Sequence, residues 1–122
     1  MDYETARRFL INMTNGNNPD TFLGRLQQGE PPIPGQVTSI LLSLKVLFAA
    51  LQGVEALDRE LVHVLYQLAS EGRQQFDRWR GAGVVWPPLL DQDLTRITYA
   101  VRSIYAGVWE DFSQPQGKLS YH

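Results

Sequence analysis

The sequence contains no cysteine among its 122 residues. This absence excludes disulfide scaffolds, thiol catalysis, zinc–thiolate sites and iron–sulfur ligation. Histidine is also scarce, because only His63 and His122 occur and they do not stand at the spacing of a metal-ligand pair. The sequence therefore predicts no metal centre, and we expect no bound cofactor.

An excess of basic residues is missing as well. Eleven lysines and arginines stand against thirteen acidic residues, which gives a net charge of −2. Because nucleic-acid binding needs a surface that neutralises phosphates, this balance argues against a nucleic-acid partner. The N-terminus, Met1-Asp2-Tyr3-Glu4, lacks the basic and then apolar layout of a signal peptide. We expect a soluble, cytoplasmic protein.

The motifs of common catalytic sites do not occur either. There is no G-x-x-x-x-G-K-[ST] or G-x-G-x-x-G loop for phosphates, and no serine stands in a G-x-S-x-G context. The acidic pairs Asp91/Asp93 and Glu110/Asp111 fall at predicted helix ends, where capping and solvated carboxylates are expected. These patterns favour a protein that is not an enzyme.

A long apolar helix is the strongest positive feature of the chain. The segment Val37–Leu51 carries one charge, Lys45, and its apolar residues cover more than one side of a helix. It is shorter than the roughly twenty residues that cross a bilayer, so we expect no membrane span. Such a helix is either the centre of an all-helical domain or shared with a partner, and homodimerisation would satisfy the second alternative.

Helix-breaking residues divide the rest of the chain into further helices, and no segment shows the alternation of a strand. Asn18 and Pro19 resemble a helix cap followed by a first helical proline, and glycines end several apolar stretches. We predict an all-α fold of about five helices, packed around the helix at 36–52 with the last two helices as its main neighbours. The predicted helices span 2–14, 19–28, 36–52, 58–80 and 90–112, so that residues 1–112 form one domain and 113–122 a flexible tail.

Two proline-rich connectors are the candidate contact surfaces. Prolines 31, 32 and 34, and then 87 and 88, exclude helix and stiffen the backbone. Trp86 stands on the second connector, and tryptophan concentrates at interaction hot spots. The alternatives are that Trp86 packs in the core and that the first connector is only a rigid spacer. The predicted partner-binding residues are Trp86, Pro87, Pro88, Pro32, Ile33 and Pro34.

A small enzyme or a helical ligand binder is the alternative function. Its site would lie near His63, where Glu60 can orient the imidazole ring as a general base needs. The other members of such a site would be Tyr66, Arg73 and Asp77 on the same predicted helix. A ligand binder would instead use an apolar cavity lined by the tryptophans.

Three segments resemble a family of small cyanobacterial proteins, some of which carry the label dethiobiotin synthetase. They are Pro32–Leu44, which contains Ile33-Pro34-Gly35-Gln36-Val37, Leu57–Leu61 and Val85–Asp91. The resemblance implies a cyanobacterial cytosol. The labelled enzyme class uses a phosphate-binding loop and an α/β nucleotide-binding fold, and this sequence matches neither. The function that we predict is therefore a small interaction module, an adaptor or assembly factor, whose partner is another protein or a second copy.

Overall fold

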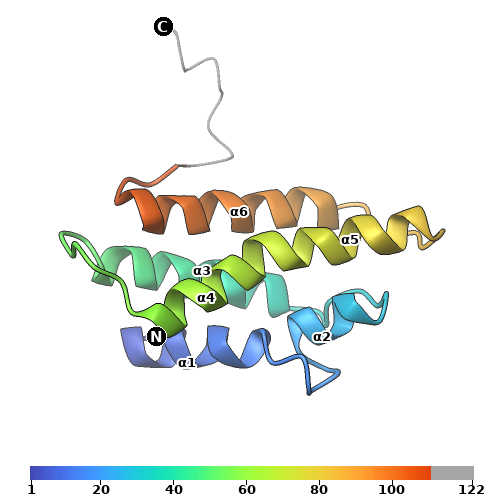
Figure 1. Ribbon diagram of the computed structural model, residues 1–122, viewed down its shortest axis with the longest axis horizontal. Coiled ribbons are helices and arrows are strands. Elements are labelled where there is room, and N and C mark those ends of the chain that lie inside the picture. Colours follow the sequence, from blue (N-terminus) through green and yellow to red (C-terminus); the bar gives the residue numbers. More distant parts are fainter. Residues whose placement is uncertain (111–122) are drawn as a thin grey trace, which may run out of the picture.

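The computed structural model describes residues 1–110, and within that range every regular element is a helix (Figure 1). A π-helical segment, η1, joins α4 to α5 in one continuous rod, so residues 1–110 form five helical rods. This confirms the predicted all-α fold. The predicted tail, 113–122, and the last two residues of the predicted final helix lie outside the described residues. The elements are α1 (Tyr3–Met13), α2 (Phe22–Gln27), α3 (Gln36–Ala50), α4 (Arg59–Tyr66), η1 (Gln67–Glu71), α5 (Gly72–Gly81) and α6 (Leu90–Ala106).

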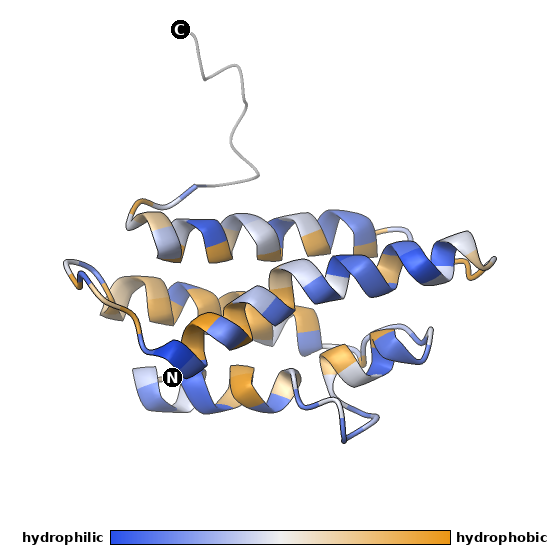
Figure 2. Cartoon of the chain, in the orientation of Figure 1, coloured by the Kyte–Doolittle hydropathy of each residue, from blue (hydrophilic) through white to orange (hydrophobic). Residues whose placement is uncertain are grey.

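The helices enclose one core. In the view of Figure 1, α6 lies above, α1 and α2 lie below, α3 lies behind, and the rod α4–η1–α5 crosses in front. Helix α3 packs mainly against α1 and α6, and these two helices run beside it. The rod and α6 were the predicted main neighbours of α3. The structure confirms α6, but α1 packs against α3 where the rod was expected. On α6, hydrophobic residues gather on the side that faces the other helices (Figure 2).

Helix α3 forms one wall of the bundle. Ile40, Leu44 and Leu47 are fully buried on its inner side. Its outer side remains open, since the Leu42 side chain is 54% exposed and Lys45 is also exposed. The helices of residues 1–110 therefore cover α3 on only part of its circumference. Helices α3 and α6 run in the same direction, so both begin at the end of the bundle where the two proline connectors lie (Figure 1).

Two helix boundaries differ from the prediction by more than two residues. Helix α2 begins at Phe22, not Pro19, because Thr21 caps it: its hydroxyl oxygen accepts a hydrogen bond from the Gly24 amide at 3.0 Å. Asn18 instead stabilises the preceding turn by accepting from the Asp20 amide. Helix α6 ends at Ala106, because Gly107 adopts a left-handed conformation with φ of 77° that terminates helices.

The π-helical segment was not predicted. The Gly72 amide bonds to the carbonyl of Gln67, five residues earlier, which widens one turn of the rod. Gly72 itself is buried where α2 and α6 approach the rod. The nearest atoms to a methyl group built on Gly72 belong to Phe22, Leu26 and Leu94, at 3.6 to 3.8 Å. The approach is therefore close but leaves room for one carbon.

An ion-pair cluster ties α1 to the start of the rod. The Arg7 guanidinium donates to Asp58 Oδ2 at 2.7 and 2.9 Å and to Glu60 Oε1 at 2.8 Å. Asp58 is also the cap of α4, since its other oxygen accepts from the Glu60 amide. The Arg7 hydrogen bonds hold the pKa of Asp58 below its ordinary value. One arginine thus fixes both a helix contact and a helix cap.

Replacing Arg7 should weaken the dependence of stability on pH. The folded-state pKa of Asp58 is depressed, so its contribution is present above the unfolded-state pKa of about 3.9 and is lost as pH falls through the folded value. In Arg7→Leu, the difference in unfolding free energy between about pH 7 and about pH 3 should be smaller than in the wild type. Urea unfolding at both pH values measures it. The matched control is Arg8→Leu, an exposed neighbour, and an equal change in both variants would contradict the assignment.

Candidate functional site

The two proline connectors meet at one end of the bundle. Pro32, Ile33 and Pro34 from the first connector and Pro87 and Leu89 from the second line one shallow hollow of about 240 Å³. The first turns of α3 and α6 complete its wall, so we call it the α3–α6 hollow. Four of these five residues, all but Leu89, were among the predicted contact residues. That segments more than fifty residues apart would line the same hollow was not predicted.

Local hydrogen bonds hold the first connector in place. The Arg25 side chain donates to the Pro31 carbonyl oxygen at 2.9 Å. The Gln36 side chain accepts from the Ile33 amide at 3.0 Å and donates to the Asp20 carbonyl oxygen at 2.8 Å. Gly35, the cap residue just before α3, has φ of 91°, a left-handed conformation that disfavours other residues. The connector therefore presents its apolar side chains on a backbone with little freedom left.

The second connector separates two hollows. Pro87 borders the α3–α6 hollow and also a second one of about 330 Å³, which we call the α5–α6 hollow. Val85 and Pro88 line this second hollow, and Val85 is 94% exposed. The segment Pro87–Leu89, which we call the proline ridge, is exposed at every residue and stands between the two hollows. The result is an apolar ridge with a depression on each side.

The structure corrects the surface placement expected for Trp86. The side chain is only 8% exposed, stacks on Phe76 with ring centroids 5.7 Å apart, and donates its indole N–H to the Phe76 carbonyl oxygen at 3.0 Å. A connector does run on the surface, but one of its side chains can still turn inward. The alternative of simple packing is the one observed, so Trp86 supports the ridge from below.

The other predicted contact residues lie at the surface. Pro34, Pro87 and Pro88 are exposed, Ile33 is 37% exposed, and Pro32 is half-buried. Two exposed apolar residues of the same surface were not predicted: Val85 and Leu89, the latter 64% exposed. Both could have been predicted from the sequence, since they are large apolar residues that flank the second double proline.

The charges around this surface are paired within the chain. Asp93, which lines the α3–α6 hollow, pairs with Arg96 at 3.3 Å. Asp91 beside the α5–α6 hollow pairs with Arg73 at 2.6 Å. Each of these carboxylates therefore has its own arginine, and the surface offers no strong excess of either sign to a partner.

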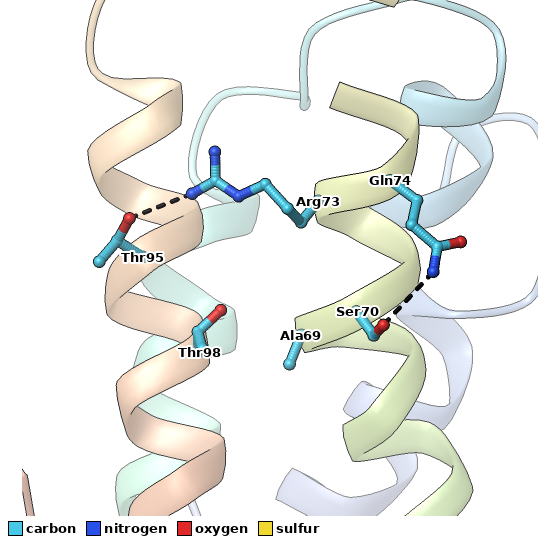
Figure 3. A pocket seen from close by; sticks show the side chains of 6 residues that line it. All are labelled: Ala69, Ser70, Arg73, Gln74, Thr95 and Thr98. Atoms are coloured by element: carbon cyan, nitrogen blue, oxygen red, sulfur yellow. Dashed lines mark hydrogen bonds between the residues drawn. The ribbon is translucent and has the colours of Figure 1, made fainter. Parts of the chain in front are cut away.

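A third depression follows the contact between the rod and α6. Arg73 reaches from α5 across this groove to α6, where it donates to the Thr95 hydroxyl at 3.1 Å (Figure 3). The hydroxyl of Ser70 accepts a long hydrogen bond from Gln74 at 3.5 Å along the same wall. The groove measures about 500 Å³. Its one guanidinium is already held by Thr95 and Asp91, so the groove presents no free charge that would select a ligand.

The residues of the alternative site near His63 do not form a common pocket among the three depressions described above. His63 and Tyr66 are exposed on α4 and line none of the three. Arg73 lines the groove, whereas Asp77 pairs with Arg80 at 3.0 Å. An enzyme site built on these four side chains therefore receives no support from their arrangement.

Residues 1–110 hold no group of three or more histidine and acidic side chains placed to bind a metal ion. None of the helices in this range has the length and apolar character needed to cross a membrane.

Comparison with known proteins found no match for the chain. The comparison therefore neither supports nor contradicts the resemblance to small cyanobacterial proteins. No protein-family model matches the chain, and neither a curated protein nor a solved structure is significantly similar to it.

Proposed function

We propose that the protein is a small non-catalytic interaction module, an adaptor or assembly factor, that binds its partner through the proline ridge and the α3–α6 hollow. The observation that carries the proposal is the convergence of both proline connectors on one surface. Exposed Ile33, Val85 and Leu89 make this surface apolar, and such patches on soluble proteins mark interaction sites. Proline-stiffened backbone adds affinity because little conformational freedom remains to be lost on binding.

The cytoplasm is the proposed site of action. The chain has no cysteine that an oxidising compartment would pair. The partner is a protein surface, because the paired charges around the ridge do not provide the basic face that a nucleic acid requires.

Capture of a partner should depend on the ridge and the hollow. The chain is immobilised and exposed to the soluble extract of its source organism, with Ile33→Asp and Leu89→Asp as test variants. Both positions are exposed, so the substitutions place a charge on the contact surface without disturbing the core. We expect a protein retained by the wild type to be recovered at least about tenfold less by either variant.

The matched control is Val54→Asp. Val54 is 48% exposed and belongs to the loop between α3 and α4. This loop lies at the opposite end of the bundle from the start of α6 (Figure 1). The control variant should retain the partner as the wild type does. Equal recovery by all four proteins, each shown to be folded by circular dichroism, would contradict the proposed surface.

A further inference from the structure

The loop between α1 and α2 contains the one asparagine–glycine dipeptide of the sequence, Asn15-Gly16. Both residues are exposed, and the loop projects from the lower edge of the molecule in Figure 1. An asparagine followed by glycine is open to attack by the backbone nitrogen of that glycine, because glycine has no Cβ to block the approach. The dipeptide is therefore a candidate site of chemical modification, separate from the proline ridge.

The Asn15 side chain is folded back over the backbone. Its Oδ1 accepts a hydrogen bond from the Asn17 amide at 3.0 Å, so the side chain forms an Asx turn. The ring of atoms closed by this hydrogen bond contains both the Asn15 Cγ and the Gly16 nitrogen, which are the atoms that must join. The Gly16 amide donates no hydrogen bond within residues 1–110, so no partner in that range holds the nitrogen away. We infer that Asn15 is a site of spontaneous deamidation in the folded protein.

The reaction needs only water. The Gly16 nitrogen loses its proton to solvent and attacks the Asn15 Cγ, which closes a succinimide ring, and the side-chain nitrogen takes a proton from water and leaves as ammonia. Water then opens the ring. Opening at Cγ gives aspartate, whereas opening at the backbone carbonyl carbon gives isoaspartate, in which the chain runs through the former side chain. Either product replaces a neutral amide with a carboxylate and adds one negative charge to the net charge of −2.

Deamidation changes a loop that supports two helix ends. The backbone carbonyl oxygen of Asn15 accepts from the Thr21 hydroxyl at 2.9 Å, and the Thr21 hydroxyl oxygen in turn caps α2. In isoaspartate this carbonyl oxygen belongs to a free carboxylate outside the main chain, and the backbone gains one carbon. The new charge also follows directly on Thr14, the C-cap of α1, where a helix disfavours anions and where the last turn has no basic residue. The modified protein should therefore be less stable.

Asn18 is an internal control in the same loop. Its Oδ1 accepts from the Asp20 amide, also at 3.0 Å, so Asn15 and Asn18 form the same kind of turn. The residue after Asn18 is Pro19, whose nitrogen carries no hydrogen and cannot become the nucleophile. Asn18 should therefore keep its side-chain amide while Asn15 is converted.

The test follows the full chain during incubation for several weeks at neutral and at mildly alkaline pH. The peptide that holds Asn15 should gain about 1 Da, faster at the higher pH, and should become a substrate of protein isoaspartyl methyltransferase. Fragment spectra assign the change to Asn15 or to Asn18. In Gly16→Ala the conversion should be at least about tenfold slower, because the new Cβ hinders the approach. This methyl group meets only the far end of the Gln27 side chain, with Oε1 at 3.1 Å, so the variant should fold.

Thermal melting measures the effect on the two helix ends. Incubated wild type should unfold about 2 °C or more below fresh wild type, while Gly16→Ala should melt at the same temperature before and after incubation. Three results would overturn the assignment of the site: an Asn15 peptide of unchanged mass, equal conversion of Asn18, or equally fast conversion in Gly16→Ala. Full conversion with an unchanged melting temperature would refute the effect on the caps.

Discussion

Truncation of Trp86 to alanine should lower the free energy of unfolding by about 3–5 kcal/mol, the range for removing a large buried aromatic side chain. The indole ring is 8% exposed and stacks on Phe76, so its removal leaves a cavity beneath the proline ridge. It also removes the donor to the Phe76 carbonyl oxygen. Urea unfolding followed by circular dichroism gives the change directly.

Two companion variants separate the causes. Trp86→Phe keeps an aromatic ring but leaves the Phe76 carbonyl oxygen without its donor, so we expect a smaller loss of about 1–3 kcal/mol. Val85→Ala changes the neighbouring residue, which is 94% exposed, and should stay within about 0.5 kcal/mol of the wild type. If Trp86→Ala were as stable as Val85→Ala, the core position of the indole would be wrong.

Gly24→Ala should be the second strongly destabilising substitution, with an expected loss of at least about 2 kcal/mol from overpacking. A methyl group on Gly24 would press on the Asn18 carbonyl oxygen, far inside van der Waals contact, and would lie 2.9 Å from Thr21 Oγ1. Because Thr21 is the cap of α2, any movement that relieves this contact also disturbs the start of the helix. Thermal unfolding monitored by circular dichroism measures the loss.

Gly72→Ala is the matched control, since both glycines are buried in helical backbone. At Gly72 the new methyl group meets only side-chain atoms at ordinary contact distances of 3.6 Å or more. The gain in helix propensity of up to about 1 kcal/mol should then make this variant equal to or more stable than the wild type. Equal destabilisation by both substitutions would show that the glycines have a common requirement for flexibility, against the steric explanation.

Much of the fold was predictable because the chain marks its helix boundaries clearly. Helix α3 begins one residue after Gly35 and ends shortly before Gly53, as those glycines and the preceding prolines predict. The end of α6 was missed because its apolar spacing continues past Ala106 to Val108, while the left-handed Gly107 overrides it. Val108 is 67% exposed, so its place in the apolar pattern did not reflect burial.

The candidate site was predictable only in part. Composition identified the proline connectors, but the position of Trp86 on a connector says nothing about the direction of its side chain. That direction depends on the Phe76 ring and carbonyl oxygen, ten residues away, which only the folded rod brings within reach. The joining of the two connectors in one hollow depends in turn on α3 and α6 beginning at the same end of the bundle.

The shared direction of α3 and α6 also has a consequence for the order of folding. Two antiparallel helices can pair across a short turn, but the whole rod α4–η1–α5 separates α3 from α6 along the chain. A loop of about fifty residues must therefore close before these two helices meet, which slows folding relative to a bundle of local hairpins. During synthesis, α1 can pack on α3 early, whereas Ile40, Leu44 and Leu47 gain their full cover only when α6 emerges. Among the helices of residues 1–110, the last to be made thus completes the core.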